Sequence, residues 1–313
     1  MFSLEGRRVP ALYLVGWVGS VMGLAVLLVS FMAAGGGAAP WLFLAGVVVL
    51  ALGLIAAAGS QAIERGHRPD LAYRGPSPVL AFVVVIAITL LGIVVVIAPL
   101  SALGMDPTAP AATALSLVIT LLAYVATVRL LVVGPGSLSW AEMGVRRPDR
   151  EAVRELLIGA LFALPALVVT IALSLLLGAF LERPASPLPL SGDGLGLLFN
   201  LVSAAVLAPI GEELFFRGFA TTAWARSLGA AWPAIARGAV FFAIAHVITL
   251  FDASFATGAQ RAVFSFVALL PVGVALGWLF LSRSSMYAAI GLHGAFNGIQ
   301  VLLAFAAAGA LPR

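Results

Sequence analysis

The sequence predicts an all-α fold, namely a polytopic transmembrane helix bundle of about nine spans with its N-terminus in the cytoplasm. Of the 313 residues, 62% are hydrophobic and only 10% are charged, and the mean hydropathy is +1.14. Soluble domains contain about 45–50% apolar residues, so the surplus in this chain must face lipid. We therefore expect an integral, multi-pass membrane protein whose first partner is the lipid bilayer.

Nine apolar segments are long enough to cross a bilayer, which takes about 20 helical residues. The first segment is too long for the apolar core of a signal peptide and precedes no obvious cleavage site, so we interpret it as a retained span. The predicted spans are Ala11–Ala33, Trp41–Gly59, Val79–Pro99, Ala111–Val133, Val153–Leu181, Leu195–Ala223, Pro233–Leu250, Ala262–Leu281 and Met286–Ala308.

The positions of the arginines orient the predicted bundle, because cytoplasmic loops of membrane proteins carry an excess of basic residues. The N-terminus and the loops after an even number of crossings hold most of them, whereas the opposite side holds Arg183, Arg261 and Arg313. This distribution predicts a cytoplasmic N-terminus and an external C-terminus. The arginines assigned to the cytoplasm are Arg7, Arg8, Arg65, Arg68, Arg74, Arg146, Arg147, Arg150, Arg154, Arg226 and Arg283.

Charge and residue usage exclude two classes of function. The net charge is +4, but the arginines are scattered between apolar runs and form no basic patch with interleaved aromatic residues, which excludes a nucleic-acid partner. The chain has no cysteine, so it has neither disulfides nor thiolate chemistry. All 17 basic residues are arginine, as is typical of GC-rich bacterial genomes, which favours a bacterial plasma membrane.

The chain divides by chemistry into two regions. Residues 1–190 form about five spans that contain almost no ionisable side chain. Residues 191–313 form about four spans and contain every candidate catalytic residue. No inverted internal repeat is visible, which argues against a secondary transporter.

An amphipathic segment, residues 137–152, precedes the fifth span. Ser139 and Glu142 have the spacing of a helix capping box, and Trp140 is suited to the membrane interface. We therefore expect a short surface helix on the cytoplasmic side.

Two adjacent carboxylates, Glu212 and Glu213, lie inside the sixth apolar segment. Burying an ionised carboxylate in hydrocarbon costs a few kcal/mol, so such residues usually pair, face water or take part in chemistry. Arg217 follows Glu213 by four residues, the favourable order for an ion pair on a helix. Glu212 lies about 100° around the helix and stays free for proton transfer. Alternatively, the ion pair of Glu213 and Arg217 only locks two helices together.

Pro209 and Gly211 precede this acidic pair. Proline cannot donate a backbone hydrogen bond, so in an α-helix Pro209 frees the carbonyl of Ala205. Together with Gly211 it predicts a kink that widens the bundle beside Glu212 and admits water.

Two of the three histidines lie in later apolar segments. Phe242 and His246 are four residues apart, so the phenyl ring can pack against the imidazole on one helix face. His293 and Asn297 have the same spacing and can donate hydrogen bonds into one cavity. The third histidine, His67, lies in a predicted cytoplasmic loop and is expected to be dispensable.

The three patterns together resemble a known family. Glu-Glu-x-x-x-Arg at 212–217, Phe-x-x-x-His at 242–246 and His-x-x-x-Asn at 293–297 are similar, in this order on separate helices, to the motifs of the CAAX protease and bacteriocin-processing family, also called CPBP or Abi. The similarity extends over about Leu195–Ala308. It implies an intramembrane endopeptidase that acts on a membrane-anchored protein or peptide.

The resemblance also implies roles for the site residues. Glu212 and His246 would activate a water molecule, His293 and Asn297 would stabilise the oxyanion, and Arg217 would hold Glu213. The cofactor stays open between none and a divalent metal such as zinc. If a metal is bound, Glu212, His246 and His293 are its expected ligands and Glu213 is the base.

Two other functions remain alternatives. An ion or proton-coupled transporter could use the same polar side chains to bind or relay ions. A catalytically silent scaffold or immunity protein could retain them for stability alone.

Overall fold

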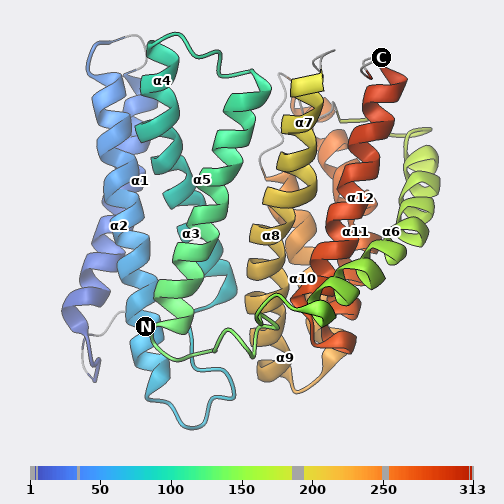
Figure 1. Cartoon of the computed structure of the whole chain (residues 1–313). Helices are drawn as coiled ribbons and strands as arrows, with labels where there is room; N and C mark the ends of the chain where they lie inside the picture. Colours follow the sequence, from blue (N-terminus) through green and yellow to red (C-terminus); the bar gives the residue numbers. More distant parts are fainter. Residues whose placement is uncertain are drawn as a thin grey trace. The chain divides into compact units, whose positions relative to one another are not determined.

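The computed structural model describes residues 4, 6–33, 36–184, 194–248, 254–309 and 311. Within these ranges the chain is helical and has no strand (Figure 1). Among the described residues, eight helices are long and apolar enough to cross a membrane, and a further apolar helix, α10 (Ala231–Val247), is shorter. The predicted all-α polytopic bundle is therefore confirmed.

Contacts divide the chain into two compact units, and the first comprises residues 1–107 and 115–139. Its first two helices pack most extensively against each other, and Gly16 and Gly23 let their backbones meet without an intervening Cβ. Arg7 forms an ion pair with Glu64 at 2.9 Å near the end of the second helix. The elements of this unit are α1 (Pro10–Met32), α2 (Ala39–Gly66), α3 (Pro78–Gly92), η1 (Ile93–Ile97), α4 (Ala98–Ala102), most of α5 (Pro110–Val128) and η2 (Arg129–Val133).

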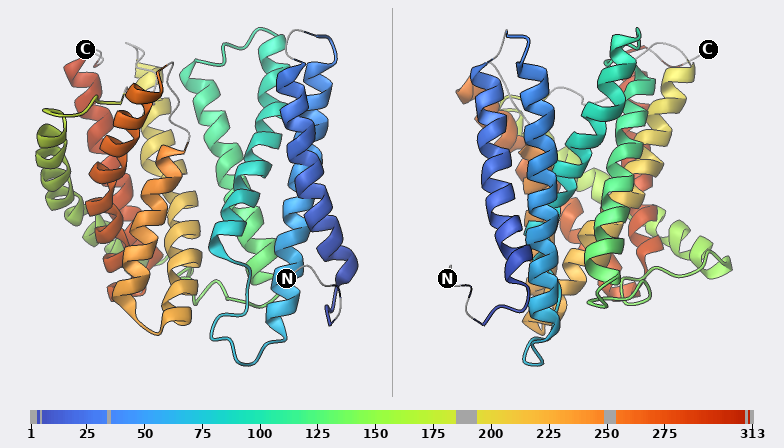
Figure 2. Two further views of the ribbon diagram at one scale, coloured as in Figure 1. Left: turned by 180° about the vertical axis from the view of Figure 1, so that it is seen from behind. Right: turned by 90° about the vertical axis from the view of Figure 1, so that its left-hand side faces the viewer.

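The second unit comprises residues 108–114 and 140–313. In it, α6 packs mainly against α12 and α10 packs mainly against α11 (Figure 2). Residues 194–228 form one continuous helix in which α-helical and π-helical segments alternate. The elements are α6 (Arg150–Leu177), α7 (Gly194–Val202), η3 (Ser203–Leu207), α8 (Ala208–Glu212), η4 (Glu213–Thr221), α9 (Thr222–Leu228), α10, α11 (Phe255–Arg283) and α12 (Met286–Ala307).

Helix α6, the fifth predicted span, therefore packs with the C-terminal helices, although it precedes residue 190. The division of the chain into residues 1–190 and 191–313 is a prediction about chemistry. By packing, the boundary lies near residue 140.

The short surface helix that we predicted within residues 137–152 is not formed. Residues 140–144 make a turn, with Gly144 in the left-handed region at φ +72°, and α6 begins only at Arg150. Asp149 caps α6 by accepting a hydrogen bond from the amide of Ala152 at 2.8 Å. The segment thus forms a single turn in place of the predicted helix, because a glycine with positive φ ends it.

Two of the π-helical segments end two residues before a proline. Segment η1 ends at Ile97 before Pro99, and η3 ends at Leu207 before Pro209. Proline lacks an amide hydrogen and its ring collides with the carbonyl of the preceding turn, so a wider turn relieves the contact. The widening that we expected beside Glu212 thus takes the form of π-helical turns before and after Pro209.

Helices α6 and α12 approach each other through glycines. A Cβ at Gly159 would collide with the carbonyl of Ala288, and a Cβ at Gly291 would collide with the carbonyl of Leu156. Small residues allow such close contact between membrane helices, where dispersion forces drive association. These two contacts hold α12, which contains His293, against α6.

We predict that Gly291→Val separates these helices and lowers the free energy of unfolding by about 1–3 kcal/mol, the usual cost of overpacking. Thermal unfolding of the purified protein in detergent measures the change. Gly66→Ala is the matched control, because a Cβ at that position would meet nothing within 4 Å. Equal unfolding temperatures for Gly291→Val and the wild type would contradict the packing described here.

Candidate active site

Three side chains from three different helices meet inside the second unit. Glu212 ends α8, His246 lies near the end of α10, and His293 lies in α12. Oε2 of Glu212 is 3.5 Å from Nε2 of His246 and 3.8 Å from Nε2 of His293. The structure therefore brings together the carboxylate and both imidazoles that the sequence motifs single out.

Glu213 links its own helix to α12. Its Oε1 atom accepts a hydrogen bond from Nη1 of Arg217 at 2.9 Å and is 2.7 Å from Nδ1 of His293. The side chains of Glu213 and Arg217 are 0% and 1% exposed, and that of His293 is 5% exposed. Nη2 of Arg217 also lies 3.5 Å from the carbonyl oxygen of Gly273 in α11. The ion pair predicted between Glu213 and Arg217 is thus present, and it also anchors His293.

The contacts of the two Nδ1 atoms define the orientation of both imidazoles. Nδ1 of His246 is 2.8 Å from the carbonyl oxygen of Phe242. A carbonyl only accepts hydrogen bonds, so this nitrogen carries the proton. Oε1 of Glu213 already accepts from Arg217, so Nδ1 of His293 donates to it as well. In both neutral rings, Nε2 is therefore the unprotonated nitrogen, and both Nε2 atoms face Glu212.

Phe242 contacts both imidazoles and the guanidinium of this cluster. Its ring centroid is 4.3 Å from that of His246 and 5.7 Å from that of His293. Cζ of Arg217 lies 4.2 Å from the same centroid, a cation–π contact. The sequence predicted only the contact with His246, because the other two depend on how the helices pack.

Asn297 lies one helical turn after His293, but its observed hydrogen bond goes to the backbone. Its Nδ2 atom donates to the carbonyl oxygen of Ala204 at 2.9 Å. In the π-helical register of η3, the amide of Ala208 donates to Ser203, so residue 209 would donate to Ala204. Pro209 cannot do so, and Asn297 supplies the missing donor. The carbonyl that Asn297 serves is thus one residue before Ala205, which we expected from an α-helical register.

Both carboxylates retain an unsatisfied oxygen. Oε2 of Glu212 and Oε2 of Glu213 are buried and make no hydrogen bond. A buried acceptor without a donor costs about 1–3 kcal/mol, more when it is charged, so the site favours a bound donor such as water. Among the residues that the structure describes, no group of three His, Asp or Glu side chains has the geometry to hold a metal ion.

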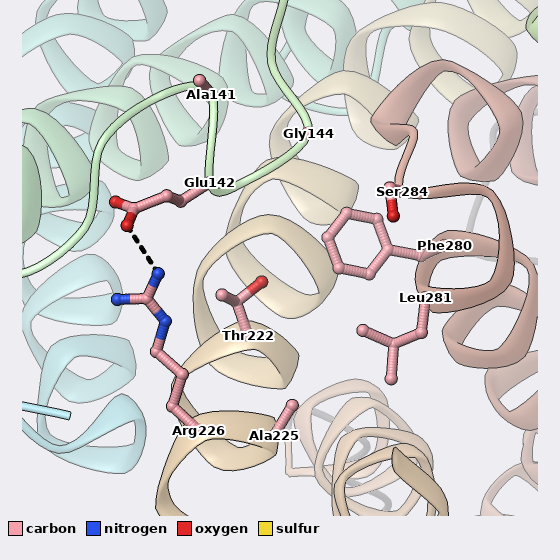
Figure 3. Close-up of a pocket in the computed structure, with 9 residues that line it drawn as sticks. All are labelled: Ala141, Glu142, Gly144, Thr222, Ala225, Arg226, Phe280, Leu281 and Ser284. Atoms are coloured by element: carbon pink, nitrogen blue, oxygen red, sulfur yellow. Dashed lines mark hydrogen bonds and ion pairs between the residues drawn. The ribbon is translucent and has the colours of Figure 1, made fainter. Parts of the chain in front are cut away.

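A cavity of about 340 Å³ lies elsewhere in the same unit, at the ends of α9 and α11 (Figure 3). Arg226 and Glu142 form an ion pair of 2.6 Å on one side of it, and Phe280 and Leu281 lie on the other. Thr222, which lines the cavity, follows Glu212 by ten residues, or about 15 Å of helix. The cavity is therefore separate from the Glu212 cluster. No motif in the sequence indicates it.

A second charged pair links α6 to the end of α11. Glu155 is 3% exposed and accepts two hydrogen bonds from Arg283. The sequence contains one signal for this pair, an acidic residue close to the start of the fifth span. Its partner could not be recognised, because Arg283 also fits the pattern of an ordinary loop arginine.

The fold and this cluster define a polytopic membrane protein with a carboxylate–imidazole site inside its helices. Residues 194–299 match a protein-family model described as type II CAAX prenyl endopeptidase Rce1-like. All three motifs lie within this range, so this region is similar to type II CAAX prenyl endopeptidases over the part of the chain that carries the resemblance. No curated protein and no solved structure matches the chain.

We predict that Arg217→Ala lowers the free energy of unfolding by about 3–5 kcal/mol, because it leaves the buried carboxylate of Glu213 without its counter-charge. The double variant Glu213→Leu with Arg217→Met should recover most of this loss, since it removes both charges. Chemical or thermal unfolding in detergent gives the values. Asp70→Asn, in the exposed pair with Arg68, is the control and should leave stability unchanged because solvent screens that pair. A single Arg217→Ala variant as stable as the wild type would contradict the prediction.

Proposed function

We propose that the protein is an intramembrane endopeptidase of the CAAX-protease type, which hydrolyses a peptide bond in a membrane-anchored protein or peptide. The observation that supports this most is the carboxylate of Glu212 facing Nε2 of both His246 and His293 within a membrane helix bundle. The match of residues 194–299 to the CAAX endopeptidase model supports the same reaction class.

In the proposed reaction, Glu212 is the general base. Its unsatisfied Oε2 accepts a proton from a water molecule while the water oxygen attacks the carbonyl carbon of the scissile bond. His246, whose side chain is 33% exposed, lies beside Glu212 and passes the proton to the nitrogen of the leaving amine. The carbon–nitrogen bond then breaks, which yields a carboxylate and an amine.

His293 and Asn297 are the proposed donors to the oxyanion of the tetrahedral intermediate. His293 directs Nδ1 at Glu213, so it donates from Nε2 only as an imidazolium. This requirement is compatible with the local charge, because Glu212, Glu213 and Arg217 carry a net charge of about −1 when all are ionised. The amide of Asn297 has two N–H groups, and one of them is used on Ala204.

The proposed setting is a bacterial plasma membrane in which the N-terminus is cytoplasmic. A substrate anchored in the same bilayer would present its peptide bond where its membrane helix ends, because a helix must open before its backbone can react. Prenylated proteins and bacteriocin-type peptides are both candidate substrates.

We predict that Glu212→Gln lowers kcat at least about 100-fold, the usual minimum contribution of a general base, with little change in unfolding temperature. Cleavage of labelled prenyl-peptides and of membrane-anchored peptides by the reconstituted protein measures the rate. His67→Ala is the matched control, because His67 is an exposed histidine that bonds only to the carbonyl of Ile63.

The same experiment separates the alternative functions. Full peptidase activity in Glu212→Gln would overturn the role of Glu212. Ion transport without cleavage by the wild type would favour the transporter, and a wild type that neither cleaves nor transports would favour the silent scaffold.

We also predict that activity survives dialysis against a chelator, because the reaction proposed for Glu212 and His246 uses only their own acid–base chemistry. Metal analysis of the same preparation should then give much less than one zinc per chain. Loss of activity on dialysis and recovery on adding zinc would instead assign Glu212, His246 and His293 as ligands.

A further inference from the structure

The turn that precedes α6 contacts both the helix that contains Glu212 and the helix that contains His293, at some distance from the two side chains. We call residues 140–146 the strap. The amides of Gly144 and Val145 donate to Ala141 and Trp140 at 3.0 and 2.9 Å, which closes the strap into a compact turn. Gly144 has φ +72°, a conformation that costs other residues about 1–2 kcal/mol, so a glycine is favoured there.

On one side, the strap contacts the helix that contains Glu212. Met143 is completely buried, and a Cβ at Gly218 would lie 3.2 Å from its carbonyl oxygen. Gly218 directly follows Arg217 and is six residues, or about 9 Å of helix, from Glu212. Glu142 adds an ion pair with Arg226 in α9.

On the other side, the strap holds the start of α12. The carbonyl of Gly144 accepts a hydrogen bond from the amide of Met286 at 3.3 Å. This amide is one of the first N–H groups of α12, which have no partner within the helix, and Ser285 provides no side-chain cap. The carbonyl of Arg146 accepts from the hydroxyl of Tyr287 at 2.6 Å. Met286 is seven residues, or about 10 Å of helix, from His293.

The cavity of Figure 3 borders the strap, so fewer packing contacts support the hydrogen bonds that join the strap to α12. Ala141, Glu142 and Gly144 all line it, so the strap is only partly packed on that side. Its position therefore depends on Met143, on the ion pair of Glu142 with Arg226 and on the two hydrogen bonds to the start of α12. The strap also lies outside residues 194–299, the part of the chain that the family model covers.

We infer that the strap positions the His293 half of the site relative to the Glu212 half. This inference rests on the proposed function. The strap joins η4 and α12 at points about two helical turns from the reacting groups, so its displacement would tilt one half against the other. A shift of about 1 Å in a catalytic group can lower a rate by about 100-fold.

Two conservative changes and two matched controls test the inference by kinetics. Tyr287→Phe removes only the hydroxyl that bonds to the carbonyl of Arg146, and Tyr73→Phe removes a buried hydroxyl that bonds to the carbonyl of Pro76 in the first unit. Gly144→Ala adds a Cβ that would lie 3.0 Å from the amide nitrogen of Met286. Its control is Gly136→Ala, because Gly136 has a similar positive φ of +76° but a Cβ there would meet nothing within 4 Å. The strap variants should lower kcat about tenfold or more and leave KM within about twofold. Both controls should keep wild-type kcat.

Hydrogen exchange of the first turn of α12 provides a readout that does not need activity. The amide of Met286 should exchange faster in Gly144→Ala and in Tyr287→Phe than in the wild type and the controls. Unchanged exchange, or faster exchange with unchanged kcat, would overturn the positioning role. A wild type without Glu212-dependent cleavage would overturn the proposed function instead, and the exchange data would still decide whether the strap holds α12.

Discussion

The second unit depends on one shared acceptor, Oε1 of Glu213, which accepts hydrogen bonds from Arg217 and His293. This atom neutralises a buried guanidinium and joins η4 to α12. Arg217 in turn contacts a carbonyl of α11 and the ring of Phe242 in α10, so four helices meet at one buried ion pair. Charged groups inside a membrane bundle are costly unless paired, and removal of either partner leaves the other exposed to that cost. The pair therefore fixes the fold and the orientation of His293 together.

Close backbone contacts then place α12 with the accuracy that the site needs. Glycines at 159 and 291 let α6 and α12 touch, and Gly294 approaches the carbonyl of Ala205 in η3. Asn297 completes the hydrogen bonding of Ala204, which Pro209 leaves without a donor. Proline, the π-helical register and Asn297 thus form one local arrangement: the proline that widens the helix beside Glu212 also creates the acceptor that holds α12 against it. The second N–H group of the Asn297 amide leaves room for the role proposed for it at the oxyanion.

Much of this could be predicted from the sequence, because hydropathy defines the helices and four-residue spacings define their faces. The pair of Glu213 with Arg217 and the contact of Phe242 with His246 each lie within one helix, so spacing alone indicates them. The bond between Glu213 and His293 could not be predicted, since it depends on how two helices pack. The helix expected within residues 137–152 failed because Gly144 adopts a positive φ that composition does not reveal. The strap's bonds to the start of α12 give no signal in the sequence, because they use the backbone carbonyls of Gly144 and Arg146.

The central arrangement can be measured directly by nitrogen NMR of the imidazoles, since the chain has three histidines and His67 can be replaced to simplify assignment. If Glu213 orients His293 as described, the proton of the neutral ring resides on Nδ1, as it does in His246. Glu213→Gln should then change the nitrogen shifts of His293 more than those of His246. A neutral His293 with its proton on Nε2, or a spectrum insensitive to Glu213→Gln, would contradict the proposed site.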